Sequence, residues 1–457
     1  LRVGSYMSVS GRTQGNAGRP FTDWSKIKLT FPYQGSLFGG LAWLSYSTAF
    51  VRLATVLAKR ADGKPVKLVY DESNFYCNGD DSGTYTCKIG VKKDGTITAA
   101  QWDIVGVRNP IFDKTYECTA IPNLRGTHEW ALVNKGHQTC YRHGAHACVP
   151  HGVMMDRVAA ELGLDPTEVA LKNDGCRGHS WDWVTRYQKD NGFPQRWSLK
   201  EVIDAGKKAI GWEKKRHAPG AKKLANGKMH GLGFISINEW DWRLRNRSLA
   251  CLVLRDGIVS ILGLHCDCGI NVESGFRQCV GAELGIKYED VLVQVQSTDV
   301  STYDLVAPGG SWGTPSTIPQ LIVAARELKQ KILGNAVMIP IFRNKKPEEL
   351  SIKNSEIYEI ANPANKMAVK DASPILWALD PPIVHPTAGE MPADLTSDGK
   401  PDRTQYVMAR QAHFIEVEVD TETGLVDVTN IVCVNDVGNI FNPEGAEGQQ
   451  YGGAVMG

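Results

Sequence analysis

The sequence predicts an α+β fold, with two mixed α/β domains that contain hairpins and glycine-rich loops. Residues 412–420 and 425–435 alternate between apolar and polar side chains on either side of the turn Thr421–Gly424, which indicates a β-hairpin. Residues 150–162 carry apolar side chains at helical spacing and end at Gly163, which indicates an amphipathic helix. Helices and hairpins are mixed along the chain, as is typical of the α+β class.

The first part of the chain contains further helices, a strand and a hairpin. Residues 1–34 predict a loop, and residues 47–60 have helical spacing before the break at Asp62–Pro65. We expect a strand at 66–70 and a hairpin formed by 84–91 and 96–105 around an Asp-Gly turn. Asp165 followed by Pro166 is typical of a helix N-cap and first helical position, and residues 199–210 predict another helix.

The second part of the chain mixes strands and long helices. The expected elements are strands at 250–255, 258–265 and 291–297 and helices at 272–285 and 315–334. Residues 336–405 are rich in Pro, Asn and Asp and predict an irregular excursion, and Gly448–Gly453 predict a closing loop.

Length and composition limit the class of protein. A chain of 457 residues is too long for one ordinary core, and we expect domains at 1–180 and 181–457, with 176–230 as the boundary region and the second domain incomplete at its C-terminal end. A formal net charge of +1 gives no indication of a nucleic-acid or membrane-surface protein. The eleven cysteines are scattered, which favours reduced thiols in a cytoplasmic protein.

Four glycine-rich segments could bring backbone N–H groups close to an anionic group. They are Gly35–Gly40, Cys268–Asn271, Gly309–Thr314 and Gly448–Gly453, and the first three precede expected helices. A tight turn before a helix is an equally good interpretation of any one of them. Their spacing matches neither a Walker loop nor a dinucleotide-binding fingerprint.

Residues 137–151 contain four histidines, two cysteines and Arg142. His143, His146 and His151 invite a metal-site interpretation, but no carboxylate lies at ligand spacing, so a packed loop is favoured. Arg142 keeps its charge and therefore needs an anionic or carbonyl partner, which could be a ligand or a structural salt bridge. The acidic residues of 416–427 alternate along the expected hairpin and predict a solvated strand face.

Several short motifs follow one another in a fixed order. They are GSLFGG at 35–40, KPVKL at 64–68, CYRHG at 140–144, the helix pair from Met155 to Pro166, AELG at 282–285, GSWGT at 310–314, EVD at 418–420, and the series DVG, NP, GQ and GG within 436–453. In this order they resemble the molybdopterin-binding large subunit of the xanthine oxidase/aldehyde oxidase family, the molybdenum hydroxylases, over nearly the whole chain.

The resemblance implies a cofactor, a reaction class and partner subunits. The cofactor would be molybdopterin, or its cytosine dinucleotide form, carrying molybdenum. The reaction would insert oxygen derived from water into an N-heterocycle, an aldehyde or a cyclic carbonyl compound. Electrons would leave through [2Fe–2S] clusters and FAD, which are expected on partner subunits.

The resemblance also implies roles for individual residues. Phe38, Arg142 and His143 are the implied catalytic residues, with Phe38 beside the oxo ligand of the metal and Arg142 facing the substrate. No protein ligand to the metal is expected. The implied cofactor-binding residues are Gly35, Leu37, Phe38, Gly39, Gly269, Asn271, Gly310, Ser311, Trp312, Gly313, Thr314, Gln449 and Gln450.

The sequence departs from the family pattern at several positions. Leu41 replaces the usual Lys, Trp312 replaces an Arg, and His143 replaces a Gly. The Cys that carbon monoxide dehydrogenases carry at position 143 is also absent, which argues against carbon monoxide oxidation. The family's catalytic glutamate follows the last of these motifs, so we expect it on a second molybdopterin-binding chain or in unrecorded sequence.

Two alternatives to a hydroxylase remain open at this point. One is a molybdenum-dependent hydratase of an activated C=C bond, which would turn over without an electron acceptor. The other is a non-catalytic scaffold homologue, which the altered segment Cys268–Asn271 favours slightly and which would contain no molybdenum.

Overall fold

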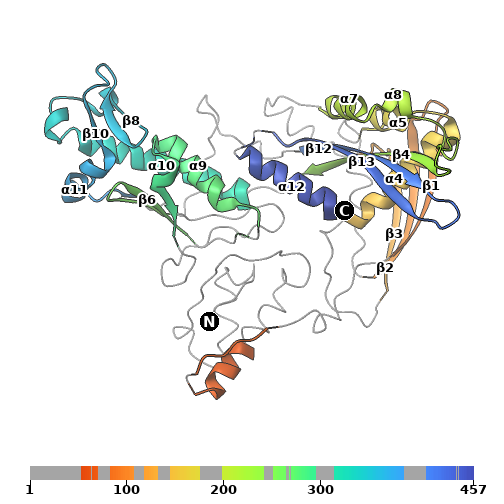
Figure 1. Ribbon diagram of the computed structural model, residues 1–457, viewed down its shortest axis with the longest axis horizontal. Helices are drawn as coiled ribbons and strands as arrows, with labels where there is room; N and C mark the ends of the chain where they lie inside the picture. The colour runs from red at the N-terminus through yellow and green to blue at the C-terminus, as the bar shows by residue number, and fades with distance from the viewer. Residues whose placement is uncertain are drawn as a thin grey trace. The chain divides into compact units, whose positions relative to one another are not determined.

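The computed structural model describes residues 53–62, 64–69, 83–107, 118–131, 145–174, 198–240, 251–263, 267, 269–294, 313–384, 408–438, 440 and 442–456. The chain divides into two compact units, which are described one at a time. Unit 1 comprises Leu1–Asp71, Trp242–Gln405 and Phe441–Ala446, and unit 2 comprises Glu72–Asp241, Tyr406–Ile440 and Glu447–Gly457. Both contain helices and sheets (Figure 1), which confirms the predicted α+β class.

Unit 2 contains two three-stranded sheets. In the first, β1 (Gly83–Val91) and β2 (Ile97–Val107) form the predicted hairpin, and β3 (Asn123–Ala131) adds to β2 in parallel. In the second, β12 (Met408–Val419) and β13 (Val426–Asp436) form the predicted hairpin, and β4 (Met229–Trp240) pairs antiparallel with β12. The strands β3 and β4 were not expected from sequence.

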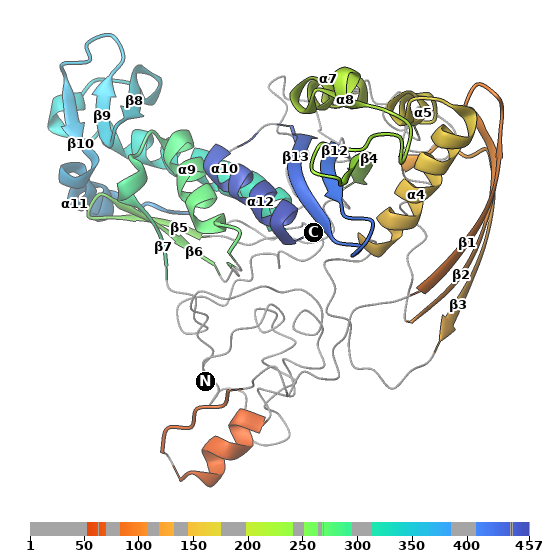
Figure 2. The same cartoon turned by 45° about the vertical axis from the view of Figure 1, so that its right-hand side comes forward.

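In the described part of 145–215, four helices pack on or beside these sheets. They are α4 (Ala145–Leu162), α5 (Pro166–Lys172), α7 (Leu199–Ile210) and α8 (Trp212–Lys215). The predicted start of α4 at residue 150 is wrong, because Pro150 lies inside the helix. Helix α4 lies beside both sheets (Figure 2). Its Gly152 lies against Ile235 of β4, while Met154 and Met155 are buried in the cluster that contains Trp102 of β2.

An aromatic group closes the core of unit 2 between α7, α8 and the second sheet. The ring of Trp212 packs edge-on against Phe414, with 5.4 Å between ring centroids, and Phe234 lies 4.9 Å from Phe414. Gly206 of α7 allows this approach, because a Cβ atom there would lie 2.2 Å from the Phe414 ring. The backbone of α7 can therefore lie directly on the ring.

Asn173, the C-cap residue of α5, has a structural role. Its Oδ1 accepts a hydrogen bond from the Ile97 N–H at 2.8 Å, and its Nδ2 donates to the carbonyls of Gly95 and Val169, each at 2.8 Å. The side chain is buried. Asn173 thus fastens the turn between β1 and β2 to the end of α5.

Unit 1 is built around a four-stranded sheet in the order β11-β5-β6-β7. Its strands are β5 (Cys251–Arg255), β6 (Ile258–Leu262), β7 (Val291–Val293) and β11 (Ile383–Val384), and β6 and β7 are parallel. The long helices α9 (Val272–Leu284) and α10 (Gly313–Ala336) bury their apolar side chains in one cluster with β5 and β6. These elements match the predicted order.

Two predictions in unit 1 were wrong. Residues 350–384 are not an irregular excursion, because they form β8 (Leu350–Lys353), β9 (Glu356–Glu359), β10 (Lys366–Ala368), α11 (Val369–Leu379) and β11. The turn between β8 and β9 consists of Asn354 and Ser355, both at positive φ, and such polar residues predict a loop from sequence. Residues 64–69 lie outside any strand and are mostly exposed, whereas residues 53–60 are helical as expected.

Short 3-10 turns complete unit 1, at η6 (Tyr288–Asp290), η8 (Pro340–Phe342) and η9 (Pro347–Glu349). Among the described helices of either unit, none combines the length and the apolar character needed to span a bilayer.

Candidate functional site

Most of the residues that the motifs single out lie outside the described residues. These are the catalytic candidates Phe38, Arg142 and His143 and the cofactor-binding candidates Gly35, Leu37, Gly39, Gly310, Ser311 and Trp312. Their roles stay predictions. The described members fall into two groups, one in unit 1 and one on the C-terminal helix.

The group in unit 1 lies at the starts of two neighbouring helices. Gly269 and Asn271 precede α9, and Gly313 and Thr314 are the first residues of α10. The two helices contact each other, and Arg326 Nε of α10 donates to Glu283 Oε1 of α9 at 2.7 Å. Two of the glycine-containing motifs thus extend to the starts of one pair of packed helices.

The backbone at the start of α9 has the geometry that the glycine pattern suggested. Gly269 has φ +93° and its N–H donates to Asp267 Oδ1 at 2.9 Å, and Asn271, the N-cap residue, has φ 57°. The Asn271 side chain makes no capping hydrogen bond to the helix. A helix N-terminus of this kind, with an exposed polar residue beside it, suits an anionic group.

The second group lies on α12 (Pro443–Met456), which corrects the prediction of a closing loop over Gly448–Gly453. Glycine has low helix propensity, so a run of glycines predicts a loop from sequence alone. The helix is anchored at its start, where the Gly445 N–H donates to Asn442 Oδ1 at 3.1 Å. From its second turn onward, the glycines Gly448, Gly452 and Gly453 leave the helix backbone without side chains to cover it.

That surface of α12 is open. A Cβ atom built at Gly448, Gly452 or Gly453 would meet nothing within 4 Å. Gln449 and Gln450 are exposed, and Tyr451 and Val455 expose 70% and 87% of their surface. Tyr451 and Val455 are four residues apart and therefore lie on the same side of the helix.

The amide of Gln450 is oriented by a neighbouring strand. Its Oε1 accepts a hydrogen bond from Asn435 Nδ2 of β13 at 2.7 Å. Because the oxygen is used in this way, the Nε2 group is left to donate to a further acceptor. Sequence reasoning missed Asn435, which carries no motif of its own.

Each of the two groups by itself has features that suit a polar, negatively charged ligand. The group in unit 1 supplies helix N-termini, and α12 supplies carboxamide groups and glycine backbone that a Cβ atom would otherwise cover. They do not resemble a bare metal site, since none of the described residues forms a group of three or more His, Cys, Asp or Glu that could hold a metal ion.

His151 and Glu416 lie in surroundings that indicate a structural role. His151 is buried in α4, and burial lowers its pKa to about 4. Glu416 corrects the prediction of a solvated strand face, because its side chain is only 15% exposed and accepts hydrogen bonds from Lys215 and His230. Burial raises the pKa of Glu416, but these hydrogen bonds outweigh burial and hold that pKa below its ordinary value.

Comparison with known families gives two matches, each described as a molybdopterin cofactor-binding domain. One covers residues 21–174 and the other residues 205–457, which is more than half of the chain. The family resemblance derived from the motifs is therefore confirmed.

Curated relatives are similar over almost the whole chain. The xanthine dehydrogenase molybdenum-binding subunit of Escherichia coli O157:H7 is 23% identical over 95% of this chain and 57% of its own length. The aldehyde oxidoreductase molybdenum-binding subunit PaoC of Escherichia coli strain K12 is 23% identical over 94% of this chain and 55% of its own length. The chain thus spans just over half the length of the relatives that it matches.

Solved structures show the same fold. Quinoline 2-oxidoreductase from Pseudomonas putida 86 superposes with a TM-score of 0.72 and 18% identity, covering 98% of this chain and 58% of that chain. Aldehyde oxidoreductase from Desulfovibrio gigas superposes with a TM-score of 0.68 and 21% identity, covering 95% and 45%. At these identities the likeness concerns the fold alone.

Proposed function

The chain belongs to the molybdopterin-binding large subunits of the molybdenum hydroxylase family, and we propose that it is the cofactor-binding subunit of a multisubunit hydroxylase or dehydrogenase. The observation that carries the proposal is the pair of molybdopterin cofactor-binding matches in one chain, over residues 21–174 and 205–457. The same matches support the domain division at 1–180 and 181–457 that the sequence suggests.

The cofactor class of this family is molybdopterin with molybdenum. When bound, it supplies the centre that transfers oxygen derived from water and accepts electrons from the substrate. In our proposal the helix N-termini after Gly269–Asn271 and at Gly313–Thr314 bind the anionic tail, because N-terminal amide groups and the helix dipole favour negative charge. Gly310, Ser311 and Trp312, which precede Gly313 in the sequence, are assigned to the same role by motif.

The remaining cofactor contacts are assigned to α12 and to the first glycine-rich segment. Gln449 and Gln450 donate hydrogen bonds to the pterin or its phosphate, and Gly448 lets the cofactor approach the helix backbone. Gly35, Leu37, Phe38 and Gly39 are assigned to the environment of the metal by motif.

Arg142 and His143 are assigned to the substrate. The Arg142 guanidinium stays charged and can polarise a carbonyl group or bind a carboxylate, and His143 can hydrogen-bond a polar group. The substrate class is an N-heterocycle, an aldehyde or a cyclic carbonyl compound. Curated relatives carry names of xanthine dehydrogenase and aldehyde oxidoreductase subunits, which supports this range.

Partners follow from the same proposal. Electrons would pass to a [2Fe–2S] subunit and an FAD subunit, and a second molybdopterin-binding chain or further sequence would supply the general-base glutamate. A cytoplasmic location is supported by the free thiols of Cys87, Cys251, Cys279 and Cys433.

Activity of the purified complex tests the proposal. We expect oxidation of a substrate of this range only when an electron acceptor is present. The substitution Arg142→Ala should lower kcat/KM by roughly 2–4 kcal/mol in transition-state terms, as for loss of a preorganised electrostatic donor. Molybdenum content should not change. Turnover without any acceptor would point to hydration, and loss of folding in Arg142→Ala would identify a structural salt bridge.

A further inference from the structure

A pair of histidines lies in direct contact at the edge of the aromatic core of unit 2. His217 follows α8, and His230 is the second residue of β4. The two atoms His217 Nε2 and His230 Nδ1 are 2.6 Å apart, and the ring centroids are 4.9 Å apart. The His230 side chain is 4% exposed, while His217 is half-buried and can be reached from solvent.

The outer nitrogen of each ring is engaged by a group that only accepts hydrogen bonds. His230 Nε2 lies 2.9 Å from Glu416 Oε1, and His217 Nδ1 lies 2.8 Å from the Ala218 carbonyl oxygen. Each of these nitrogens must therefore carry its hydrogen, and a neutral imidazole has only one. If both rings are neutral, the lone pairs of the two inner nitrogens point at each other, so either a proton shared in a hydrogen bond or a metal ion must lie between them.

The outer contacts of the two rings are those that metal-binding histidines show. A metal-ligating histidine donates its second N–H to a carboxylate or a backbone carbonyl, which fixes the tautomer and the ring orientation. Here His230 has the carboxylate and His217 has the carbonyl. Glu416 is itself held by Lys215 Nζ at 2.6 Å, so the supporting carboxylate is fixed before any ion arrives.

We propose that His217 Nε2 and His230 Nδ1 bind one late first-row transition-metal ion, Cu²⁺ or Zn²⁺, with water completing its coordination. Imidazole nitrogens suit these ions, with Cu²⁺ the tighter binder. Metal–nitrogen distances of about 2.0–2.1 Å require the two nitrogens to separate to roughly 3.3 Å for a tetrahedral angle. The proposal therefore requires His217, which lies outside the strands and is half-buried, to shift outward when the ion binds.

The charges around the pair favour a cation. Glu416 and Glu418 of β12 face this side of β4, Glu418 being the register partner of His230, and Asp427 of β13 is the register partner of Glu418. Lys215 pairs with Glu416, and Lys228 pairs with Asp427, so both lysines are already neutralised by acidic partners. Glu418, which accepts from the neutral amide of Asn226, adds negative charge.

The ion would be weakly held compared with a structural zinc site. The described residues offer no third His, Cys, Asp or Glu in a group that could hold a metal, so two protein ligands are expected. Binding would join the segment after α8 to β4 by a bond to each histidine. We expect the ion to stabilise residues 216–230 against local unfolding, and this stabilisation should rise with the concentration of the ion.

Titration of the full chain with Cu²⁺ and with Zn²⁺ tests the site, after chelator treatment and at pH 7.5. We expect the His217→Gln variant to bind one ion fewer than the wild-type chain, with loss of a Cu²⁺ electron paramagnetic resonance signal that shows coupling to two imidazole nitrogens. The matched control is His128→Gln, which removes an exposed histidine of β3 and should leave the number of ions unchanged.

A second variant tests the supporting carboxylate. Glu416→Gln keeps both inner nitrogens but weakens the acceptor for His230, and it should lower the affinity for the ion by about 10–100-fold. Equal ion binding in the wild-type chain and in His217→Gln would overturn the proposal, and would mean that only a hydrogen fills the space between the rings. Because the added ions and the readout are independent of molybdenum, this result would not affect the proposed function.

Discussion

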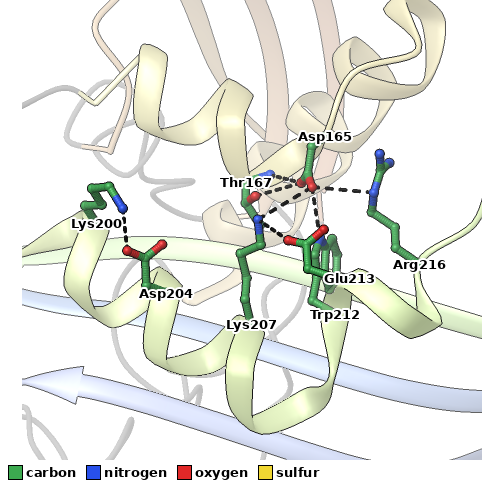
Figure 3. Close-up of polar contacts among 8 residues, drawn as sticks. All are labelled: Asp165, Thr167, Lys200, Asp204, Lys207, Trp212, Glu213 and Arg216. Atoms are coloured by element: carbon green, nitrogen blue, oxygen red, sulfur yellow. Dashed lines mark hydrogen bonds and ion pairs between the residues drawn. The ribbon is translucent and has the colours of Figure 1, made fainter.

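Asp165 Oδ2 accepts a hydrogen bond from Trp212 Nε1 at 3.0 Å, and this contact links the N-cap of α5 to the aromatic core (Figure 3). The other carboxylate oxygen, Oδ1, accepts from the N–H and the hydroxyl of Thr167. Arg216 Nε and Lys207 Nζ lie 3.4 Å and 3.9 Å from Oδ2. One carboxylate therefore fixes the relative positions of α5, α7 and α8.

Replacing this carboxylate should be costly. Asp165→Ala removes the helix cap and leaves the buried N–H of Trp212 without its acceptor, so we expect a loss of roughly 2–4 kcal/mol in the free energy of unfolding. Asp204→Ala is the control, since it breaks only the exposed pair with Lys200 on α7 and should have a far smaller effect. Similar losses in both variants, measured by denaturant unfolding, would contradict the assignment.

The contribution of the Asp165 carboxylate to the free energy of unfolding should depend on pH. Burial raises the pKa of Asp165, but hydrogen bonds from Thr167 and Trp212 outweigh burial and hold that pKa below its ordinary value. A lowered pKa stabilises the fold above about pH 4, and this contribution is lost as the pH falls further. The stability difference between the wild-type chain and Asp165→Ala should therefore shrink as the pH falls below 4.

A buried ion pair connects the end of α5 to the start of β12. Arg410 Nη1 donates to Asp174 Oδ1 at 3.1 Å, and both side chains are 2% exposed. Removing one partner leaves a charge buried, so Asp174→Ala and Arg410→Met should each cost about 3–5 kcal/mol in unfolding free energy. The double variant should cost clearly less than the sum. Additive costs would show that the two side chains do not interact.

His151 should make the fold sensitive to mild acid. Burial lowers its pKa to about 4, and its Nδ1 has no hydrogen-bond partner among the residues that the structure describes. The unfolded chain binds a proton near pH 6.5, so the stabilising contribution is full above that pH and is lost as the pH falls toward 4. At pH 5 the loss is about 2 kcal/mol.

The variant His151→Leu should lack this loss. We expect its unfolding free energy to fall less than that of the wild-type chain between pH 7.5 and pH 5. His128→Gln, at an exposed position in β3, serves as the control and should follow the wild-type chain closely. Parallel pH profiles for wild type and His151→Leu would contradict the assigned burial.

Alanine substitutions at two exposed helical glycines distinguish an effect on cofactor binding from an effect on helix stability. Gly448 of α12 and Gly334 of α10 both have open space where a Cβ atom would lie. Alanine should stabilise either helix by about 0.5–1 kcal/mol. Only Gly448→Ala should reduce the molybdenum and pterin content, because only α12 is proposed to contact the cofactor. Unchanged content in Gly448→Ala would remove α12 from the proposed site.

Local signals allowed much of the fold to be predicted. Strict alternation and a four-residue turn identified the β12–β13 hairpin, and the Asp165–Pro166 pair identified the start of α5. Both depend on neighbours in sequence. By contrast, β4 pairs with β12 across an intervening stretch that includes all of unit 1's sheet strands. No local pattern encodes such a partner.

The candidate site was predictable in part for the same reason. Motifs located Gly269, Asn271, Gly313 and the two glutamines, because glycine and amide residues before or within helices have a local meaning. Residues that act through a distant partner had no such signal. Asn435 and Glu416 belong to an ordinary alternating strand pair, and only the fold brings them to Gln450 and His230.

Cofactor binding by this chain is tested by measuring its molybdenum and pterin content after purification with its native partners. Metal analysis and pterin fluorescence after oxidation should give close to one molybdenum and one pterin for each cofactor-binding chain. A correctly folded complex that contains neither molybdenum nor pterin would contradict cofactor binding and would indicate a non-catalytic scaffold with the same fold.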